Sequence, residues 1–366
     1  MNTRKNSNNK MQSKKQLATL AALTLFGAAS GAQAQSSVTL YGVVDMGVSL
    51  DRGGIQGNST RLTSGMATQS RWGVRGSEDL GGGLSALFVV EGGFSADKGT
   101  STQNNILFGR TTIVGLRGGF GSVTLGLQDT PYFTTLNTVV DPLRNGIARS
   151  NNLMAPTGFR AANSVLYRST DMGGFSGDLM YAAGEVAGDN AAGRALGGSV
   201  GYAGGPLTVR LAHHNRNNDT ALLKNTDNAK NTLLGANYDF GVAKAYFGYA
   251  IDKGLNSAPL NNPAASFGGA APRASTDSRD LLLGVSVPLG AGTALATWIR
   301  KDDKTAFNQD AHQMALAYLY AFSKRTDLYT SYALIRNKNG AAYTEGNSEE
   351  AGTGDKQFTL GLRHRF

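Results

Sequence analysis

The sequence has no cysteine among its 366 residues and only four histidines. The lack of cysteine excludes structural disulfides, thiolate metal sites and a cysteine nucleophile. The four histidines leave little room for metal chemistry, and none of them stands in a recognisable Ser/His/Asp arrangement of the kind that a hydrolase needs. We therefore expect no enzyme, no cofactor and no metal site.

Long apolar runs are scarce as well. Residues 281–298 are uncharged and apolar enough to suggest a membrane helix, but they contain Pro288 and three glycines, which favour a hairpin instead. Residues 17–29 form the other apolar run, and they follow a basic segment and precede the small-residue pattern Ala32-Gln33-Ala34. This pattern predicts a secretory signal peptide over residues 1–34, cleaved before Gln35.

Two alternatives concern this leader. A membrane anchor is disfavoured because the apolar run is shorter than the roughly 20 residues that a helix needs to span a bilayer. Translation from Met11 would give a more compact signal, MQSKKQLATL.

The net charge of +9 comes partly from the leader. Five of the 35 basic residues and none of the 26 acidic residues lie in the first 34 positions, so 30 bases face 26 acids in the remainder. A nucleic-acid-binding protein needs a clustered basic face rather than a slight surplus, so we expect no nucleic-acid partner.

The last twelve residues, DKQFTLGLRHRF, alternate between two kinds of side chain. Phe358, Leu360, Leu362 and Phe366 share one parity, and polar residues occupy the other. An extended strand of this sequence has one apolar face and one polar face, which suits a wall between lipid and water. The chain also ends on an aromatic residue, with no polar tail after it.

The same alternation recurs along the chain. We predict sixteen strands, connected by eight long loops and seven short turns, at residues 36–50, 70–79, 84–94, 108–116, 123–128, 164–169, 175–183, 195–202, 207–215, 232–238, 242–251, 280–287, 293–300, 312–322, 328–336 and 355–366. An even number of alternating strands, with short turns at one end and long loops at the other, is typical of a transmembrane β-barrel. The first and last strands would pair and remove the edges of the sheet.

One residue and one alternative fold do not fit this pattern. Arg110 breaks the parity expected from Thr112 and Val114, which implies a bulge, a later strand start or a wrong register. The spacing of about 40 residues per hairpin resembles a propeller repeat, but a propeller blade needs four strands in that length rather than two.

Several segments resemble the general diffusion porins of β-proteobacteria. They are SSVTLYGVVDMGV at the start, SRWGVRGSEDLGGGLSALFVVEG, IVGLRGGFGSVTLGLQ, NSVLYRS and the ending LGLRHRF. The resemblance covers most of residues 35–366. It implies an all-β, sixteen-stranded outer-membrane barrel, assembled as a homotrimer, whose water-filled pore passes ions and small hydrophilic solutes by passive diffusion.

The resemblance also implies two details of the barrel. The third long loop, residues 129–163, should fold inward and narrow the channel, and Phe366 should be read by the barrel assembly machinery. The short turns would then face the periplasm and the long loops the outside. Leu166 stands where relatives often carry arginine, so the charge pattern of the constriction is not carried over from the family.

The expected chemistry is therefore the electrostatics of a narrow wet passage, in which fixed charges attract counter-ions and repel co-ions. Strand parity and loop position give the candidate pore-lining residues: Arg71, Arg75, Glu91, Arg117, Asp129, Asp141, Arg144, Arg149, Arg160, Arg168, Arg210 and Lys244. Bases outnumber acids in this set, which predicts a weakly anion-preferring pore.

Two alternative roles apply to these side chains. Arginines near the rims could satisfy turn carbonyls, and this is the expected role of Arg363 and Arg365. Asp129 and Asp141 could cap turns. A different function also fits the long polar loops, such as residues 252–278: an outer-membrane adhesin that binds a surface through them.

Overall fold

The structure, a computed structural model, describes residues 37–154, 159–259, 274–350 and 352–366. The predicted signal peptide and the middle of the long loop 252–278 lie outside the described residues. The strands are β1 (Ser37–Arg52), β2 (Ser59–Ser64), β3 (Arg71–Gly81), β4 (Leu84–Ser95), β5 (Thr100–Ser101), β6 (Thr111–Gly118), β7 (Gly121–Asp129), β8 (Arg160–Arg168), β9 (Phe175–Ala182), β10 (Ala195–Gly204), β11 (Leu207–Arg216), β12 (Ala229–Asp239), β13 (Lys244–Lys253), β14 (Asp277–Leu289), β15 (Gly292–Asp303), β16 (Ala311–Ala321), β17 (Thr326–Asn337) and β18 (Lys356–Arg365).

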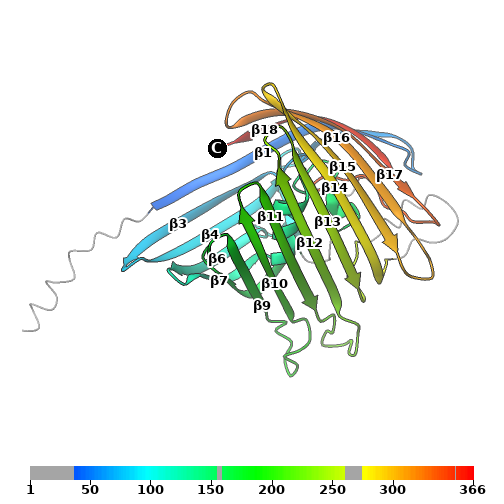
Figure 1. The fold of residues 1–366 in the computed structure, drawn as a ribbon. Coiled ribbons are helices and arrows are strands. Elements are labelled where there is room, and N and C mark those ends of the chain that lie inside the picture. Colours follow the sequence, from blue (N-terminus) through cyan, green and yellow to red (C-terminus); the bar gives the residue numbers. More distant parts are fainter. Residues whose placement is uncertain (1–36, 155–158, 260–273, 351) are drawn as a thin grey trace, which may run out of the picture.

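Sixteen of these strands form one closed antiparallel wall (Figure 1). Each long strand pairs with its neighbours in sequence, and β1 pairs with both β3 and β18, which closes the ring. The short strands β2 and β5 are additions that pair with β1 and β4. The prediction of a sixteen-stranded barrel is confirmed. Closure leaves no unpaired edge, so the backbone groups of the wall are satisfied within the sheet.

The boundary of β6 explains the irregular parity at Arg110. The strand begins at Thr111 rather than at the predicted Phe108, so Arg110 lies in the segment before it. Its backbone N–H donates to the Glu91 carbonyl at 3.3 Å. Of the three explanations for the broken parity, the later strand start is therefore correct.

The two faces of the wall differ as the alternation predicts. In β18, Phe358, Leu360 and Leu362 are exposed on the outer face, whereas Gln357 and Thr359 are buried on the inner face. No helix in the described part of the chain is long and apolar enough to cross a bilayer.

The connection between β7 and β8 folds against the inside of the wall. It contains the short helices α3 (Pro131–Thr135), η2 (Leu136–Val140) and η3 (Ser150–Asn152). Another short helix, α2 (Thr102–Asn105), lies in the connection from β5 to β6. The start of α3 is fixed by Thr130, whose side-chain oxygen accepts from the Phe133 N–H at 3.3 Å. In Figure 1 the connection between β7 and β8 lies within the ring of strands.

Two glycines in the wall make room for this loop. A Cβ added to Gly248 in β13 would lie 2.3 Å from Val140 Cγ1, and one added to Gly235 in β12 would lie 2.5 Å from Val140 Cγ2. Nearby, Asn237 Nδ2 donates to the Val139 carbonyl at 2.9 Å. The apolar side of η2 therefore rests directly on the backbone of the wall.

The far end of the loop is held by polar side chains. Gln313 Nε2 in β16 donates to the Ala148 carbonyl at 2.6 Å, and Asn152 Nδ2 donates to Gln313 Oε1 at 3.0 Å. The same Asn152 nitrogen donates to Glu345 Oε2 at 3.2 Å. Glu345 belongs to the connection between β17 and β18, residues 338–355, so the two loops are joined to each other and to the wall.

The glycine contacts predict the effect of a larger side chain. Gly248→Leu should push η2 off the wall, at a cost of about 1–3 kcal/mol in loop docking, because the site is already filled by Val140. We expect the barrel to assemble, but single-channel recordings should show a higher mean conductance with more current noise.

Gly177→Leu is the matched control. Gly177 lies in β9 away from the loop, and an added Cβ would meet only the Ser199 carbonyl oxygen within 4 Å, at 3.3 Å. Its conductance should equal that of the unmodified protein, and identical traces for both variants would contradict the packing described here.

Candidate functional site: the charged constriction

A polar cavity of about 1140 Å³ lies beside the inward loop. Residues of the strands β3, β8 and β18 line it, together with the segments around residues 67–71 and 98–110. Two loops, 129–163 and 338–355, complete the lining. Eight basic residues line it: Arg71, Lys98, Arg110, Arg144, Arg149, Arg160, Arg363 and Arg365. Three acidic residues line it: Asp129, Glu349 and Glu350. Basic residues therefore predominate among the charged residues that line the cavity.

Glu91 holds two of these arginines in place. Its carboxylate lies 2.7 Å from Arg110 Nε and 3.4 Å from Arg71 Nε, and it also accepts from the Tyr41 hydroxyl at 3.0 Å. Glu91 is only 9 % exposed, so it supports the two guanidinium groups from behind rather than facing the passage. The sequence predicted that Glu91 lines the pore, but in the structure it lies behind the two arginines instead.

A second ion pair lies near this pair of arginines. Arg160, the first residue of β8, places Nε 2.9 Å from Asp129 Oδ1 at the end of β7. The two residues are cross-strand partners, so the loop begins and ends at this ion pair. Asp129 and Arg160 both line the cavity, where their charges offset each other.

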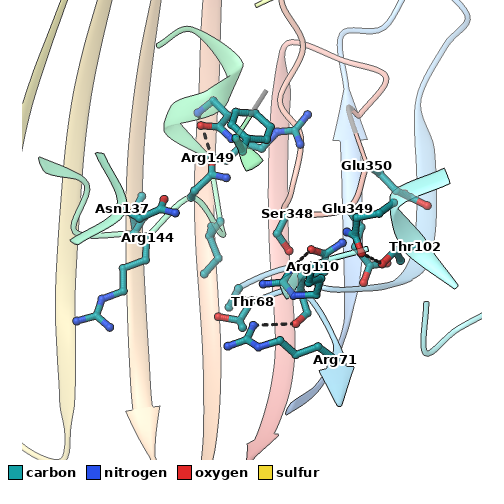
Figure 2. Close-up of a pocket in the computed structure, with 18 of the residues that line it drawn as sticks. Thr68, Arg71, Thr102, Arg110, Asn137, Arg144, Arg149, Ser348, Glu349 and Glu350 are labelled. Atoms are coloured by element: carbon teal, nitrogen blue, oxygen red, sulfur yellow. Dashed lines mark hydrogen bonds between the residues drawn. The ribbon is translucent and has the colours of Figure 1, made fainter. Parts of the chain in front are cut away.

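The loop itself contributes two basic side chains. Arg144 is exposed and makes no ion pair or side-chain hydrogen bond within the described residues. Arg149 Nε donates to Asn152 Oδ1 at 3.0 Å, and burial lowers the pKa of Arg149 to about 10, which leaves it protonated at neutral pH. Figure 2 shows Arg144 and Arg149 on the loop, with Arg71 and Arg110 on the other side of the view.

Asp141 is buried within the loop and does not line the cavity. Its carboxylate accepts from the backbone N–H groups of Leu143 at 2.8 Å and Asn145 at 2.9 Å, which is the turn-capping role of an aspartate. Burial raises the pKa of Asp141. The expectation that it faces the pore is therefore wrong, because its oxygens are used inside the loop.

The other predicted residues do not line the cavity. Arg75, Arg117, Arg168, Arg210 and Lys244 lie toward the short-turn ends of their strands, on the same parity as inner-face residues. Arg210 pairs with Asp178 at 2.6 Å, and Arg75 lies 5.1 Å from the centre of the Tyr41 ring. Their proposed contribution to permeation stays a prediction.

Six of the lining residues were not assigned to the pore from the sequence. Arg363 and Arg365 were expected to meet turn carbonyls, but both contact Asp327, at 3.0 and 2.7 Å. Arg110 was recognised only as a break in parity. Lys98, Glu349 and Glu350 lie in connections between strands, where no periodicity marks which side chain faces inward.

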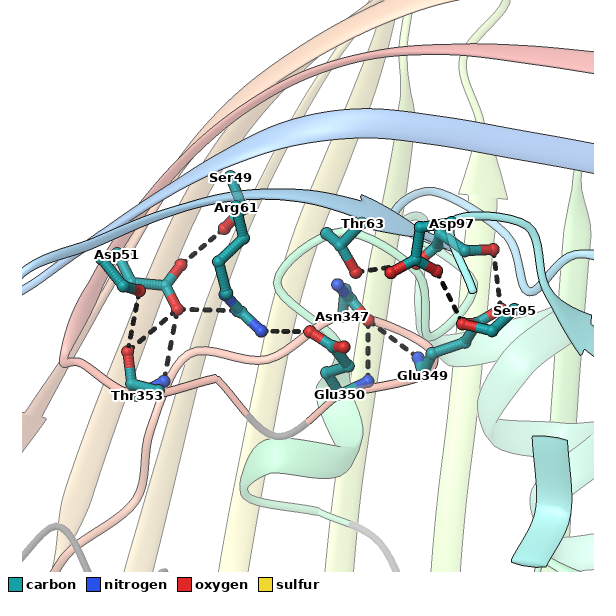
Figure 3. Close-up of polar contacts among 12 residues, drawn as sticks. Ser49, Asp51, Arg61, Thr63, Ser95, Asp97, Asn347, Glu349, Glu350 and Thr353 are labelled. Carbon is teal, nitrogen blue, oxygen red and sulfur yellow. Dashed lines mark hydrogen bonds and ion pairs between the residues drawn. The ribbon is translucent and has the colours of Figure 1, made fainter. Parts of the chain in front are cut away.

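The connection 338–355 is fastened across the long-loop end of the barrel (Figure 3). Arg61 lies between Asp51, at 2.7 Å, and Glu350. Lys98 Nζ reaches Glu350 Oε1 at 3.0 Å. Because these contacts join β1, β2 and the segment after β4, the connection has a defined position beside the cavity.

Glu349 in this connection is half-buried, and it accepts hydrogen bonds from the hydroxyls of Ser64 at 3.1 Å and Ser95 at 3.2 Å. Burial raises the pKa of Glu349 to about 7, although the two hydroxyls oppose this shift. In the described part of the chain, no three His, Asp or Glu side chains gather so that they could hold a metal ion.

A closed antiparallel barrel with an apolar outer face, a polar lumen and an inward loop defines a transmembrane channel. Residues 18–340 match the Gram-negative porin family, and the chain belongs to that family. It is 31 % identical over 397 residues to an outer membrane porin protein of Bordetella pertussis, across 95 % of this chain and 99 % of the relative. It is 33 % identical over 367 residues to outer membrane porin protein 32 of Delftia acidovorans, with the same coverage.

A solved structure is also similar. The anion-selective porin from Comamonas acidovorans superposes with a TM-score of 0.70 and 30 % sequence identity, across 91 % of this chain and all of that one. The protein is therefore an outer-membrane porin, a channel for passive diffusion. Its family and its fold are those of channels.

The raised pKa of Glu349 predicts that the ion selectivity depends on pH. Glu349 is neutral below about pH 7 and becomes negative above it, so raising the pH through 7 adds a negative charge to the cavity. The ratio of chloride to potassium permeability should fall between pH 6 and pH 8, measured as the zero-current potential across a planar bilayer. The same carboxyl affects stability. Its pKa is about 7 in the folded protein and 4.5 in the unfolded chain, so between these values the folded state binds more protons. The contribution of Glu349 to stability is therefore lost as the pH rises from 4.5 through 7.

Two variants test whether Glu349, rather than the neighbouring Glu350, causes the pH dependence. Glu349→Gln should remove the pH step in the zero-current potential, whereas Glu350→Gln should make the pore more anion-preferring at every pH and retain the step. If the pH step persists unchanged in Glu349→Gln, a group other than Glu349 causes it.

Proposed function

We propose that this porin is a weakly anion-preferring channel for inorganic ions and small hydrophilic solutes. The observation that carries the proposal is the charge of the constriction, where eight basic and three acidic side chains line one cavity. The acidic residues are largely occupied by ion pairs, since Asp129 faces Arg160 and Glu350 faces Lys98 and Arg61. The surplus positive charge raises the local concentration of anions.

Arg144 is the clearest contributor to this positive charge. It is exposed in the cavity and no carboxylate neutralises it within the described residues. A unit charge acts on an ion 6 Å away with about 0.7 kcal/mol in bulk water, which corresponds to roughly a threefold change in local ion concentration before screening. Salt at physiological strength screens over about 8 Å, so a passing anion remains within the reach of this charge.

Arg144→Gln tests the proposal. The ratio of chloride to potassium permeability should fall about twofold, since one unpaired positive charge leaves the cavity beside the inward loop. The measurement is the zero-current potential of the refolded protein in a potassium chloride gradient.

Arg325→Gln is the matched control, because it removes the same charge from an exposed short turn outside the cavity. Its permeability ratio should change little. An equal drop in both variants would mean that net charge, rather than the constriction, sets the selectivity.

We also propose that the protein works as a homotrimer in the outer membrane, with its short turns in the periplasm. The resemblance to general diffusion porins supports this arrangement. Ile106 and Leu107 follow α2 and are exposed, at 55 % and 56 %, beyond the apolar wall at the long-loop end. Exposed aliphatic residues at this position suit a contact with a neighbouring barrel better than contact with water.

The proposed role includes no catalysis. The histidines have other surroundings that support this proposal: His213 lies 2.9 Å from Thr232 Oγ1, His364 lies 2.9 Å from Thr326 Oγ1, and His312 stacks on Trp298. The leader over residues 1–34 would direct export, and the barrel assembly machinery would insert the mature chain from residue 35.

Phe366 is the proposed recognition element for assembly. Its backbone N–H and carbonyl pair with those of Gly42 at 3.1 Å, and its ring covers Gly42, where a Cβ would lie 2.3 Å from Cζ. The residue thus belongs to the seam at which the first and last strands meet.

Phe366→Ala should lower the amount of porin in the outer membrane several-fold, because the terminal aromatic residue is lost as a recognition element, while the backbone pairs with Gly42 remain available. The conductance of the molecules that do insert should not change. Quantitative blotting of outer-membrane fractions and single-channel recording make the two measurements, and normal insertion of the variant would refute the role of Phe366.

A further inference from the structure

The cavity beside the inward loop has an apolar side as well as a basic one. Six large apolar residues, which we call the apolar patch, line it: Phe133, Leu143, Ile147, Phe159, Leu295 and Leu319. Leu143 and Ile147 of the loop belong to one buried cluster with Leu295 of β15, and Leu319 of β16 packs against the edge of this cluster. The passage of inorganic ions makes no use of such a surface.

Two residues of the apolar patch offer a surface that a solute can touch. Leu319 and Phe159 are half-buried, whereas Phe133 and the three residues of the cluster are buried behind them. The Phe159 ring packs on the ring of Phe133, with 4.8 Å between the ring centres. The patch is therefore the open edge of a packed core, and an apolar group placed on it would lose contact with water.

The loop segment that carries Leu143 and Arg144 is fixed at both ends. A Cβ added to Gly284 in β14 would lie 2.9 Å from Pro142 Cγ, and one added to Gly146 would collide with the Ala67 carbonyl oxygen. The segment therefore packs closely on the wall at one end and on the chain before β3 at the other. A solute that meets it meets a surface of defined shape.

Arg144 directly follows Leu143, and both line the cavity. Their Cα atoms are about 3.8 Å apart, so an anion at the Arg144 guanidinium has the apolar patch beside it. The backbone of Arg144 is left-handed, with a φ of 51°, as are those of Asn145 and Ala148. Left-handed residues other than glycine are uncommon and concentrate at functional sites.

Asn151 adds a polar group to the same cavity. It is only 6 % exposed, and neither its side-chain oxygen nor its nitrogen has a hydrogen-bond partner in the described part of the chain. Its backbone N–H donates to Asn145 Oδ1 at 3.2 Å, which fixes its position in the loop. A buried amide normally has a partner, and its NH₂ group can donate to a carboxylate.

We propose that this cavity binds monocarboxylates with an apolar or aromatic body while they pass through the pore. This inference rests on the anion preference proposed above and names a class of solute for it. Arg144 and Asn151 take the carboxylate, and the edge of the apolar patch at Phe159 and Leu319 takes the body. One carboxylate suffices, since within the described residues Arg144 is the one base of the lining with neither an ion pair nor a side-chain hydrogen bond.

Benzoate and gluconate test the proposal, because each carries one carboxylate but only benzoate has an apolar body. The measurement is the concentration of each anion that halves the chloride conductance of the refolded porin in a planar bilayer, at neutral pH and constant ionic strength. Benzoate should need about tenfold less than gluconate, since removing about 55 Å² of ring surface from water corresponds to roughly tenfold in affinity. Benzyl alcohol, which has the ring but no charge, should block less than benzoate. Equal block by benzoate and either of the other two solutes would overturn the proposal.

Variants separate the two parts of the site. Leu319→Ser should lower the preference for benzoate over gluconate about threefold, and Leu319→Met should retain it, since it keeps an apolar side chain. Leu87→Ser is the matched control, because Leu87 is a half-buried residue of β4 outside the cavity, and it should keep the full preference. Arg144→Gln should weaken the block by both anions and leave their ratio unchanged. Retention of the heat-sensitive electrophoretic mobility of a folded barrel verifies each variant.

The zero-current potential in a potassium chloride gradient, recorded for the same molecules, distinguishes this inference from the proposed function. A chloride-signed potential with equal block by benzoate and gluconate would overturn the inference and leave the proposed function intact. A potassium-signed potential with stronger block by benzoate would contradict the anion preference and still support the binding site. An unchanged benzoate block in both Leu319→Ser and Arg144→Gln would overturn the assignment of the site to this cavity.

Discussion

The contact between Val140 and the glycines of the inner wall is the constraint on which the pore depends. Because Gly235 and Gly248 have no side chains, the helix η2 can lie against the backbone of β12 and β13. This contact, with the hydrogen bonds from Asn237 and Gln313, fixes where the loop crosses the lumen. The positions of Arg144 and Arg149, and hence the charge of the passage, follow from it.

The space under the loop is a packed core rather than a part of the channel. Tyr132, Leu136 and Val140 are fully buried there, together with Leu233 and Leu282 from the wall. Lys301 and Asp280 are buried nearby as an ion pair of 3.0 Å, with Ser278 as a further partner of the lysine. A buried pair of this kind is costly to disrupt, since removal of one partner leaves the other charge uncompensated. The loop is therefore held against one side of the barrel, and the passage lies on the other side.

Carboxylates within and beside the passage hold the arginines. Glu91 contacts Arg71 and Arg110, and Asp129 contacts Arg160. These pairs reduce the net charge, but they also fix the directions of the guanidinium groups. A weak preference for anions, rather than a strong one, is the expected result of so many partly compensated charges.

The fold could be predicted almost completely from the sequence, because every transmembrane strand has to present one apolar and one polar face. The alternation in β18 and the short turns between strands were enough to count sixteen strands. Residues of the site were harder to predict. Parity indicates which side of the wall a residue faces, but not its height along the barrel or its depth beneath other side chains, so Arg75 and Glu91 were grouped with Arg71.

Loop residues have no such period. Asp141 looks like a pore residue from its charge, yet its oxygens cap the turn at Leu143 and Asn145. Glu349 and Lys98 come beside the cavity only through contacts between connections that are more than 200 residues apart in the sequence. Those contacts depend on the closed barrel and are not visible in local sequence patterns.

The most direct test of this account is the sign of the zero-current potential of the unmodified porin, in a planar bilayer between two concentrations of potassium chloride. The surplus of arginine at the constriction predicts a potential of the sign that a chloride-preferring channel produces. A potential of the opposite sign would mean that Asp129, Glu349 and Glu350 outweigh the arginines, and it would contradict the account.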